Sequence, residues 1–183
     1  MVKEPRPGRV KTRLGTGIGM TSAAWWYRHQ ALGLVRRLRD PRWSLVLAVS
    51  PDREGMQSRV WPSDIARIAQ GGGDLGDRMK HCLMATPGPT VLIGSDIPGV
   101  TRAHIAKAFQ ALGPARSVLG PATDGGFWLV GLKCPARAPR TLFKGVRWSQ
   151  PNTMAETRSI LPAPVAVVAM LSDIDTATDL KAP

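Results

Sequence analysis

Short, continuous apolar runs alternate along this chain with segments in which apolar residues recur every three or four positions. The continuous runs are bounded by proline, glycine or aspartate, which is typical of strands buried in a sheet. Five such runs predict strands, at residues 44–50, 90–96, 116–121, 127–132 and 164–171. The periodic segments predict helices, at residues 20–39, 75–84, 102–112 and 151–161. Strands that alternate with helices predict an α/β protein, a three-layer α/β/α sandwich with a mostly parallel central sheet.

Composition indicates a globular protein with a substantial core. The chain has 183 residues, of which 43% are hydrophobic, and we expect a single domain over residues 1–183. The formal net charge of +12 favours polyanionic partners such as nucleotides, phosphorylated substrates, nucleic acid or acidic lipid. A GC-rich genome would also scatter arginines along a chain, so charge alone does not separate these partners.

Targeting and redox features are sparse. The sequence has no apolar run long enough to cross a membrane and no apolar stretch of signal-peptide length. Cys82 and Cys134 do not form a CxxC pair and are expected to be reduced thiols. We therefore expect a cytoplasmic protein without a membrane span.

The chain opens on a basic segment without apolar periodicity. Residues 2–12 contain two prolines, one glycine and four cationic side chains, those of Lys3, Arg6, Arg9 and Lys11. The prolines disfavour a helix, and the charges disfavour a buried strand. The segment is interpreted as a loop, which either holds phosphates or forms a solvated basic tail.

Aspartates follow two of the predicted strands, at the edge where open parallel sheets bind their ligands. Asp96 ends the run TVLIGSD, and Asp173 and Asp175 come directly after residues 164–171. A carboxylate at the end of a buried strand is either a turn or helix-cap residue or a ligand of Mg²⁺ or Mn²⁺. One or two such carboxylates suit a cation that bridges phosphates.

A further carboxylate lies in the sequence ATDGG, between the strands predicted at 116–121 and 127–132. Asp-Gly is a strong hairpin signal, so the local pattern favours Asp124 as a turn residue. Gly125 and Gly126 allow positive φ angles or the close approach of a ligand.

Six sequence blocks occur in order from Lys3 to Leu180, namely KEPRPGRVKTRL, GGGDLGDRM, GSDIPG, LGPATDGGFWLVGL, LFKGVRWSQPNT and LSDIDTATDL. Together they resemble the bacterial DUF2064 family, which is often labelled glycosyltransferase-like. The resemblance implies a GT-A, Rossmann-like fold of the nucleotide-diphospho-sugar transferase superfamily, near the molybdenum-cofactor and phospholactate guanylyltransferases. Relatives have a full apolar strand before the first block, whereas only Met1 and Val2 precede it here. The first strand is therefore expected to be truncated in this sequence. Either the true start lies upstream, or the sheet lacks that strand, which would leave backbone groups of the central sheet unpaired.

The resemblance implies a role for each block. The opening loop corresponds to the nucleotide-phosphate loop of GT-A nucleotidyltransferases, through Lys3, Pro5, Gly8, Arg9, Lys11 and Arg13. Among these, Lys11 and Arg13 would assist catalysis by offsetting charge on the leaving pyrophosphate.

The later blocks would supply the metal site and the remaining contacts. Asp96 matches the metal-binding aspartate of the family, and Asp175, or alternatively Asp173, would be the second carboxylate. The second block would lie against the nucleotide or sugar, through Gly72, Asp74 and Arg78. The DGG block would line the acceptor side, through Asp124, Gly125 and Gly126.

These roles imply a metal-dependent transferase that uses a nucleotide donor and Mg²⁺ or Mn²⁺. In one version, a phosphorylated small molecule attacks the α-phosphorus of a nucleoside triphosphate, and pyrophosphate leaves. In the other, an acceptor hydroxyl attacks the anomeric carbon of a nucleotide sugar, with Asp124 as a candidate base. The basic loop favours nucleotidyl transfer, and the usual label of the family favours glycosyl transfer.

Two non-enzymatic alternatives stay open. The first is a basic nucleic-acid-binding module, although no recognised nucleic-acid motif is present. The second is a family member that binds nucleotide without turnover. The arginine-rich segment 28–42 is either a solvated surface or a face for forming oligomers.

Overall fold

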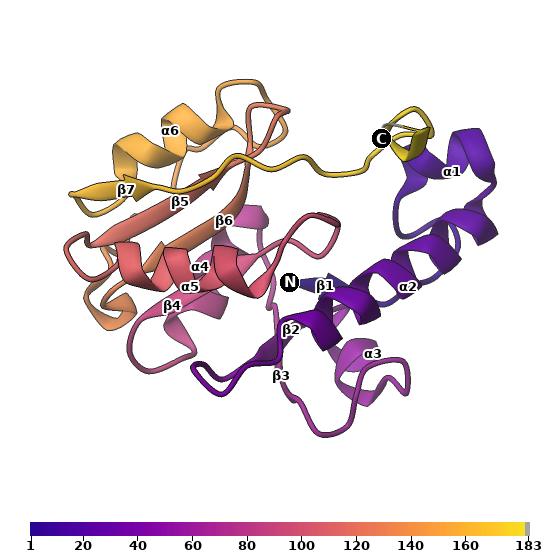
Figure 1. Ribbon diagram of the computed structural model, residues 1–183, viewed down its shortest axis with the longest axis horizontal. Helices are drawn as coiled ribbons and strands as arrows, with labels where there is room; N and C mark the ends of the chain where they lie inside the picture. Colours follow the sequence, from indigo (N-terminus) through magenta and orange to yellow (C-terminus); the bar gives the residue numbers. More distant parts are fainter. Residues whose placement is uncertain (182–183) are drawn as a thin grey trace.

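The architecture follows from a computed structural model that describes residues 1–181 (Figure 1). The strands are β1 (Val2–Lys3), β2 (Val46–Ser50), β3 (Ala66–Ala69), β4 (Thr90–Ile93), β5 (Ser117–Pro121), β6 (Phe127–Leu132) and β7 (Val165–Val167). The α-helices are α1 (Thr12–Ile18), α2 (Met20–Arg37), α3 (Asp52–Gln57), α4 (Leu75–Met84), α5 (Arg102–Ala111) and α6 (Thr153–Ile160). Short 3-10 helices form at η1 (Pro135–Arg137) and η2 (Asp179–Lys181). No helix among the described residues is both long and apolar enough to cross a membrane.

The sheet has two sections. The first is parallel throughout, in the order β1-β2-β3. The second has the order β4-β6-β5-β7, in which β5 and β7 are parallel and β6 runs antiparallel to both neighbours. Three of the five strand pairings within residues 1–181 are therefore parallel, which confirms the mostly parallel sheet that the alternating pattern predicts.

The two sections meet at the short strand β1. The Met1 amine donates to the carbonyl of Ile93 in β4 at 2.6 Å. The buried amide of Gln70 donates to the carbonyls of Val2, at 3.0 Å, and Ala48, at 2.9 Å. The first strand is as short as expected. A short first strand leaves backbone carbonyls of its neighbours without a strand partner. Here the Met1 amine and the Gln70 side-chain amide donate hydrogen bonds to three carbonyls, those of Ile93, Val2 and Ala48.

Helices cover both faces of the sheet, which gives the three layers. Adjacent residues of a strand point to opposite faces, and on β5 Val118 joins one core cluster while Leu119 joins another. The cluster of Val118 includes Leu34 of α2 and Ile105 of α5. The cluster of Leu119 includes Leu83 of α4 and residues at the end of α6. The sandwich is therefore α2 and α5, the sheet, and then α4 and α6 (Figure 1).

The predicted elements are present. The helix α4 and the strand β6 have the predicted bounds, and the others are shorter than predicted. The strand predicted at 164–171 forms a ladder only over Val165–Val167, although Leu171 N still donates to the Pro121 carbonyl at 3.1 Å. The helices α1 and α3, the strand β3 and the two 3-10 helices were not expected from the sequence. The expectation of loop is wrong from Thr12 onward, because α1 starts there directly after Lys11, which adopts the left-handed conformation.

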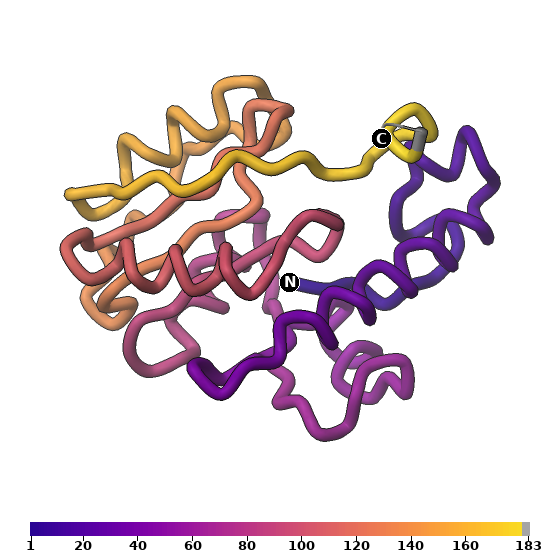
Figure 2. The backbone as a smooth tube through the Cα atoms, viewed as in Figure 1, coloured from indigo at the N-terminus to yellow at the C-terminus, as the bar shows by residue number. Residues whose placement is uncertain are grey.

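The C-terminal segment crosses from the β7 side of the sheet to α1 (Figure 2). It packs closely there, since a Cβ atom on Gly17 would lie only 2.7 Å from the Cβ of Ala177. The crossing carries Asp173 and Asp175 past the end of β4. Residues from both ends of the chain thus reach one edge of the sheet.

Candidate functional site

The basic loop between β1 and α1 lines a small cavity. This cavity has a volume of about 190 Å³, and the cations on its wall are Lys3 of β1, Arg6 and Arg9 of the loop, and Arg78 of α4. Glu54 of α3 holds the loop through ion pairs to Arg6, at 3.2 Å, and to Arg9, at 3.9 Å. The structure therefore brings Lys3 and Arg9 together with Arg78, which lies far from both in the sequence.

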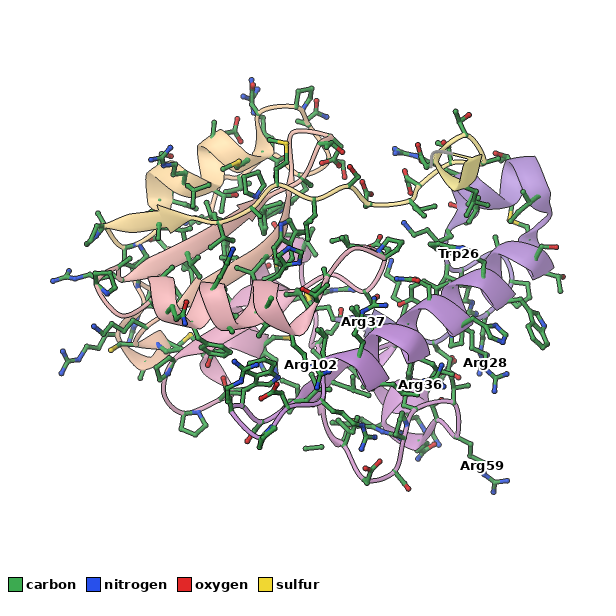
Figure 3. The ribbon with its side chains drawn as sticks, viewed as in Figure 1. Trp26, Arg28, Arg36, Arg37, Arg59 and Arg102 are labelled. Atoms are coloured by element: carbon green, nitrogen blue, oxygen red, sulfur yellow. The ribbon has the colours of Figure 1, made fainter. Side chains whose placement is uncertain are left out.

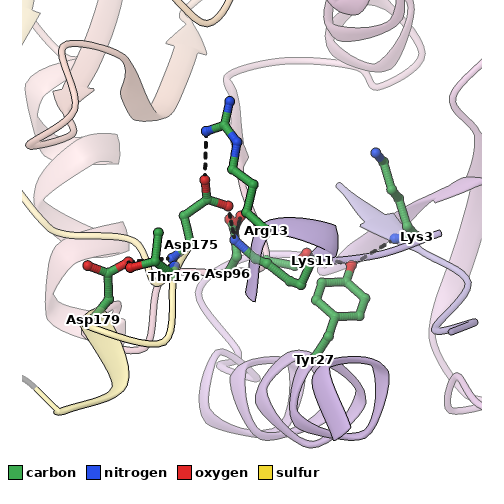
Figure 4. Close-up of polar contacts among 9 residues, drawn as sticks. Lys3, Lys11, Arg13, Tyr27, Asp96, Asp175, Thr176 and Asp179 are labelled. Carbon is green, nitrogen blue, oxygen red and sulfur yellow. Dashed lines mark hydrogen bonds and ion pairs between the residues drawn. The ribbon is translucent and has the colours of Figure 1, made fainter. Parts of the chain in front are cut away.

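Lys11 lies at the centre of the charged groups at this edge (Figure 4). Its side chain is only 7% exposed, and its Nζ lies 2.7 Å from Asp96 Oδ2 and 3.5 Å from Asp175 Oδ1. Arg13 binds the other oxygen of Asp175, at 2.9 Å. Four of the residues implied by the family resemblance, two cations and two carboxylates, thus form one network.

Asp96 follows β4 in a segment that is tied to the start of the basic loop. The hydroxyl of Tyr27 accepts from the backbone N–H of Lys3 at 2.8 Å and hydrogen-bonds to Ser95 Oγ at 2.8 Å. On the other side, Ile174 N donates to the Asp96 carbonyl at 3.3 Å. Tyr27 and Ser95 position both parts of the site, and neither was singled out from the sequence as a site residue. The only available signal is that Tyr27 is the single tyrosine of the chain.

Burial of Tyr27 gives a testable pH dependence. Its hydroxyl is desolvated, which raises its pKa from 10.0 to about 12. Because the unfolded chain ionises first, the free energy of unfolding should be unaffected by this group below pH 10 and should fall as the pH rises from 10 toward 12. At about 1.4 kcal/mol for each pKa unit, the loss approaches about 2 to 3 kcal/mol.

The measurement is an absorbance titration of the phenolate, combined with denaturant unfolding at several alkaline pH values. Since the chain has one tyrosine, the titration reports this group alone. Tyr27→Phe is the matched variant, and it should remove this part of the pH dependence. A phenol that titrates near 10 in the folded protein would contradict the buried hydrogen-bonded role.

Asp173 and Asp124 lie at the same edge of the sheet as Asp96 and Asp175, but they take no part in the ion pairs with Lys11 and Arg13. Burial raises the pKa of Asp173, and the nearby carboxylates of Asp96 and Asp124 raise it further. Asp124 Oδ1 accepts from Gly126 N at 2.9 Å, and Gly125 has a φ of +87°. The DGG block is therefore the hairpin turn between β5 and β6 that its sequence predicts, and it places the Asp124 carboxylate close enough to Asp173 to raise the pKa of that group.

The second block has a structural role at the start of α4. Asp74 Oδ1 accepts from Asp77 N at 2.9 Å, and Asp77 Oδ2 accepts from Asp74 N at 3.2 Å, which is a capping box. Gly72 is exposed. Arg78 Nε donates to the Gly73 carbonyl at 3.2 Å, and its side chain lines the cavity of the basic loop. Of the three residues implied in this block, Arg78 is the one that reaches the other candidate residues.

A divalent cation fits Asp96 and Asp175 only if Lys11 moves. Among residues 1–181, no group of three or more histidine, cysteine, aspartate or glutamate side chains is arranged to hold a metal. The Lys11 ammonium nevertheless shows that the two carboxylates point at one cation position. Mg²⁺ is commonly bound by one or two carboxylates together with substrate phosphates, so this pair suits a metal that arrives with a nucleotide.

Comparison with solved structures defines the class of protein. A candidate nucleotide-diphospho-sugar transferase from Desulfovibrio desulfuricans G20 is 33% identical, with a TM-score of 0.82 over 98% of this chain and 81% of that one. A 4-diphosphocytidyl-2C-methyl-D-erythritol synthase from Anaerococcus prevotii DSM 20548 is 12% identical, with a TM-score of 0.58 over 84% and 82%. Rv0371c from Mycobacterium tuberculosis H37Rv, in complex with manganese, is 16% identical, with a TM-score of 0.53 over 85% and 83%.

The fold is thus that of the nucleotide-diphospho-sugar transferases, which places the chain in the transferase class. The sequence profile of DUF2064, described as "Uncharacterized protein conserved in bacteria", matches residues 34–150. The chain belongs to this family, as the six blocks indicate. A search of curated proteins found no match.

Proposed function

We propose that this protein is a metal-dependent transferase that moves a nucleotidyl group from a nucleoside triphosphate to a phosphorylated small molecule. The observation that carries the proposal is the cavity lined by Lys3, Arg6, Arg9 and Arg78, next to Lys11. Two carboxylates, Glu4 and Glu54, also line it, so cations outnumber anions on the cavity wall by four to two. A surplus of fixed cations suits a triphosphate and the pyrophosphate that leaves it.

In this proposal, the loop cations bind the β- and γ-phosphates of the donor. Lys11 moves its ammonium from the carboxylates to the phosphates, and Arg13 stays on Asp175. Tyr27 holds the start of the loop next to the Asp96 segment, through its hydrogen bonds with Lys3 N and Ser95 Oγ. A divalent cation held by Asp96 and Asp175 would supply the remaining neutralisation of charge as pyrophosphate leaves, and the manganese in the Rv0371c structure supports metal use.

Glycosyl transfer from a nucleotide sugar is the second candidate. It is favoured by the relative at 33% identity, which is a candidate nucleotide-diphospho-sugar transferase. The diphosphate of such a donor would use the same cations, and Asp124 would accept the proton of an attacking hydroxyl. The two candidates therefore differ in their donors and not in the metal site.

Binding of nucleic acid remains a prediction that the site geometry does not favour. Arg28 and Arg36 of α2, together with Arg59, lie on the surface (Figure 3), and they form no ion pair with any carboxylate of residues 1–181. Arg37 is already used within the fold, because it donates to the carbonyls of Val100 and Pro98. The clustered carboxylates near Lys11 would repel a phosphate backbone, whereas a metal-bound nucleotide needs them.

A thermal-shift screen tests the proposal, with the four nucleoside triphosphates and several nucleotide sugars, each with and without Mg²⁺ or Mn²⁺. A ligand at a hundredfold excess over its Kd stabilises the folded state by about 2.7 kcal/mol. For a domain of this size, that corresponds to a rise in Tm of about 5 to 10 °C. We expect a metal-dependent shift with a triphosphate, followed by pyrophosphate release when phosphorylated acceptors are added.

Two arginine variants locate the binding site. Arg78→Gln should reduce the shift, because Arg78 lines the cavity. Arg59→Gln should not, since Arg59 is exposed elsewhere on the molecule. A shift with nucleotide sugars alone would replace nucleotidyl by glycosyl transfer, and a shift without pyrophosphate release from any acceptor would identify a binding protein without turnover. Absence of any shift would reject the proposal.

A further inference from the structure

A second, larger cavity lies beside the hairpin turn of β5 and β6. It has a volume of about 750 Å³ and is lined by Pro121, Thr123, Pro151, Met154, Arg158 and Met170, among others. Cavities of this size with mostly apolar walls and a few polar groups are typical of small-molecule sites. None of the roles given above to the basic loop or to the ion-pair network uses it.

The inner end of this cavity adjoins the carboxylates of the site. Its lining residues Thr123 and Gly125 are the neighbours of Asp124 in the turn. Pro121 and Met170 also line it. The chain that follows Met170 leads to the site, because Leu171 N donates to the Pro121 carbonyl at 3.1 Å and Ile174 N donates to the Asp96 carbonyl at 3.3 Å. The cavity of the basic loop is lined from the β1 side of β4, and the apolar cavity is lined from the end of β5, on the other side of β4. A donor and an acceptor bound in the two cavities would therefore approach each other at the carboxylates that follow β4.

The wall of the cavity is mostly apolar and carries one charged side chain. Methionine and proline side chains form much of it, Thr123 and Ser159 add two hydroxyls, and Arg158 is the only charged residue that lines it within residues 1–181. Arg158 makes no ion pair with any carboxylate among residues 1–181. An unpaired cation on an apolar wall is suited to a ligand that combines an apolar body with an anionic group.

The helix α6 starts at the hairpin turn, so Met154 on the apolar wall lies nearer the turn than the cation Arg158 does. Met154 N, at the start of the helix, donates to the Gly125 carbonyl at 3.0 Å, so α6 begins at the turn and runs away from it. Arg158 is four residues later, on the same face of the helix and about 6 Å further along its axis from the turn. A ligand that reaches from the turn to Arg158 therefore crosses the side chain of Met154.

We infer that this cavity binds the acceptor, and that the acceptor is amphiphilic, with an apolar body over Met154 and Met170 and an anionic group at Arg158. The inference rests on the proposed transferase function, which it deepens by giving the chemical class of the second substrate. A free sugar suits this cavity less well, because most of its ring hydroxyls would face proline and methionine side chains and only Thr123, Ser159 and Arg158 offer polar partners on the lining.

The test uses n-alkyl phosphates with four, six and eight carbons as probes, in calorimetric titrations of the full chain without nucleotide. Each buried methylene contributes about 0.8 kcal/mol, which corresponds to about a fourfold change in Kd. We therefore expect binding to tighten by up to about 200-fold from butyl to octyl phosphate. Arg158→Gln should weaken every probe by about tenfold while leaving the dependence on chain length intact, and Arg59→Gln, at an exposed arginine elsewhere, should change neither.

The outcomes separate this inference from the proposed function. A Kd that does not depend on chain length, or an Arg158→Gln variant that behaves like Arg59→Gln, would overturn the amphiphilic site even if nucleotides bind. If octyl phosphate binds as expected but displaces the nucleoside triphosphate, the cavity belongs to the donor and the acceptor assignment is wrong. If octyl phosphate binds and no nucleotide does, the proposed transferase function fails although the cavity takes the predicted class of ligand.

Discussion

Asp96→Asn is expected to reduce the rate of transfer by about a thousandfold or more. The substitution keeps the shape of the side chain but removes the carboxylate that lies 2.7 Å from the Lys11 ammonium. A metal ligand of this kind supplies several kcal/mol of charge stabilisation in the transition state, and about 4 kcal/mol corresponds to a thousandfold. The measurement is single-turnover pyrophosphate release, together with manganese binding in the presence of nucleotide, which should also be lost.

Asp64→Asn provides the matched control. Asp64 is an exposed aspartate that pairs with Arg39 on the surface, at 2.5 Å. Exposed ion pairs contribute little to stability, so this variant should fold and turn over normally. If Asp96→Asn and Asp64→Asn retain the same activity, Asp96 is not a metal ligand and its place near Lys11 is purely structural.

Lys11→Met is expected to have opposite effects on two measurements. Without nucleotide, the affinity for manganese should rise by about tenfold or more, because the ammonium no longer occupies the position between Asp96 and Asp175. Transfer should fall by about a hundredfold or more, because a cation that offsets charge on the phosphates is lost. Manganese binding is followed by electron paramagnetic resonance of the free ion, and transfer by pyrophosphate release.

Lys107→Met on α5 serves as the comparison, since Lys107 is exposed and forms no ion pair with any carboxylate of residues 1–181. It should alter neither manganese affinity nor transfer. Wild-type protein that binds manganese as tightly as Lys11→Met in the absence of nucleotide would show that the ammonium does not compete with the metal. The site would then hold both cations together, and the proposed movement of Lys11 would be unnecessary.

The sequence predicts the sheet and its helices because their apolar periodicity is strong. The strands at β2, β4, β5 and β6 are continuous apolar runs, and each was found within its predicted range. The position of Asp96 at the carboxyl end of a strand also follows from local pattern and from the general rule for open sheets. Elements with weak patterns were missed. One is α1, a seven-residue helix that contains two glycines, and another is β3, which has four residues, one of them Arg67.

Local sequence pattern does not predict which side chains of the candidate site contact each other. Lys11 and Asp175 are 164 positions apart, and nothing in either neighbourhood specifies that they meet. Asp74 shows the opposite case, a residue whose partner is local. Its carboxylate caps α4 by accepting from the backbone N–H of Asp77, three residues later. The sequence of its block is equally compatible with a ligand contact, so the sequence does not separate the two roles. Tyr27 carries no motif, and its importance arises only from burial between the loop and Ser95.

The crossing of the C-terminal segment to α1 also has a consequence for biosynthesis. A chain leaves the ribosome from its N-terminus, and domains fold as their residues become available. The basic loop, Tyr27 and Asp96 all emerge well before Asp175, which lies on the crossing segment. A nascent chain would therefore hold Lys11 with one of its two carboxylate partners, and could take up a metal-bound nucleotide only after nearly all of the domain had been translated.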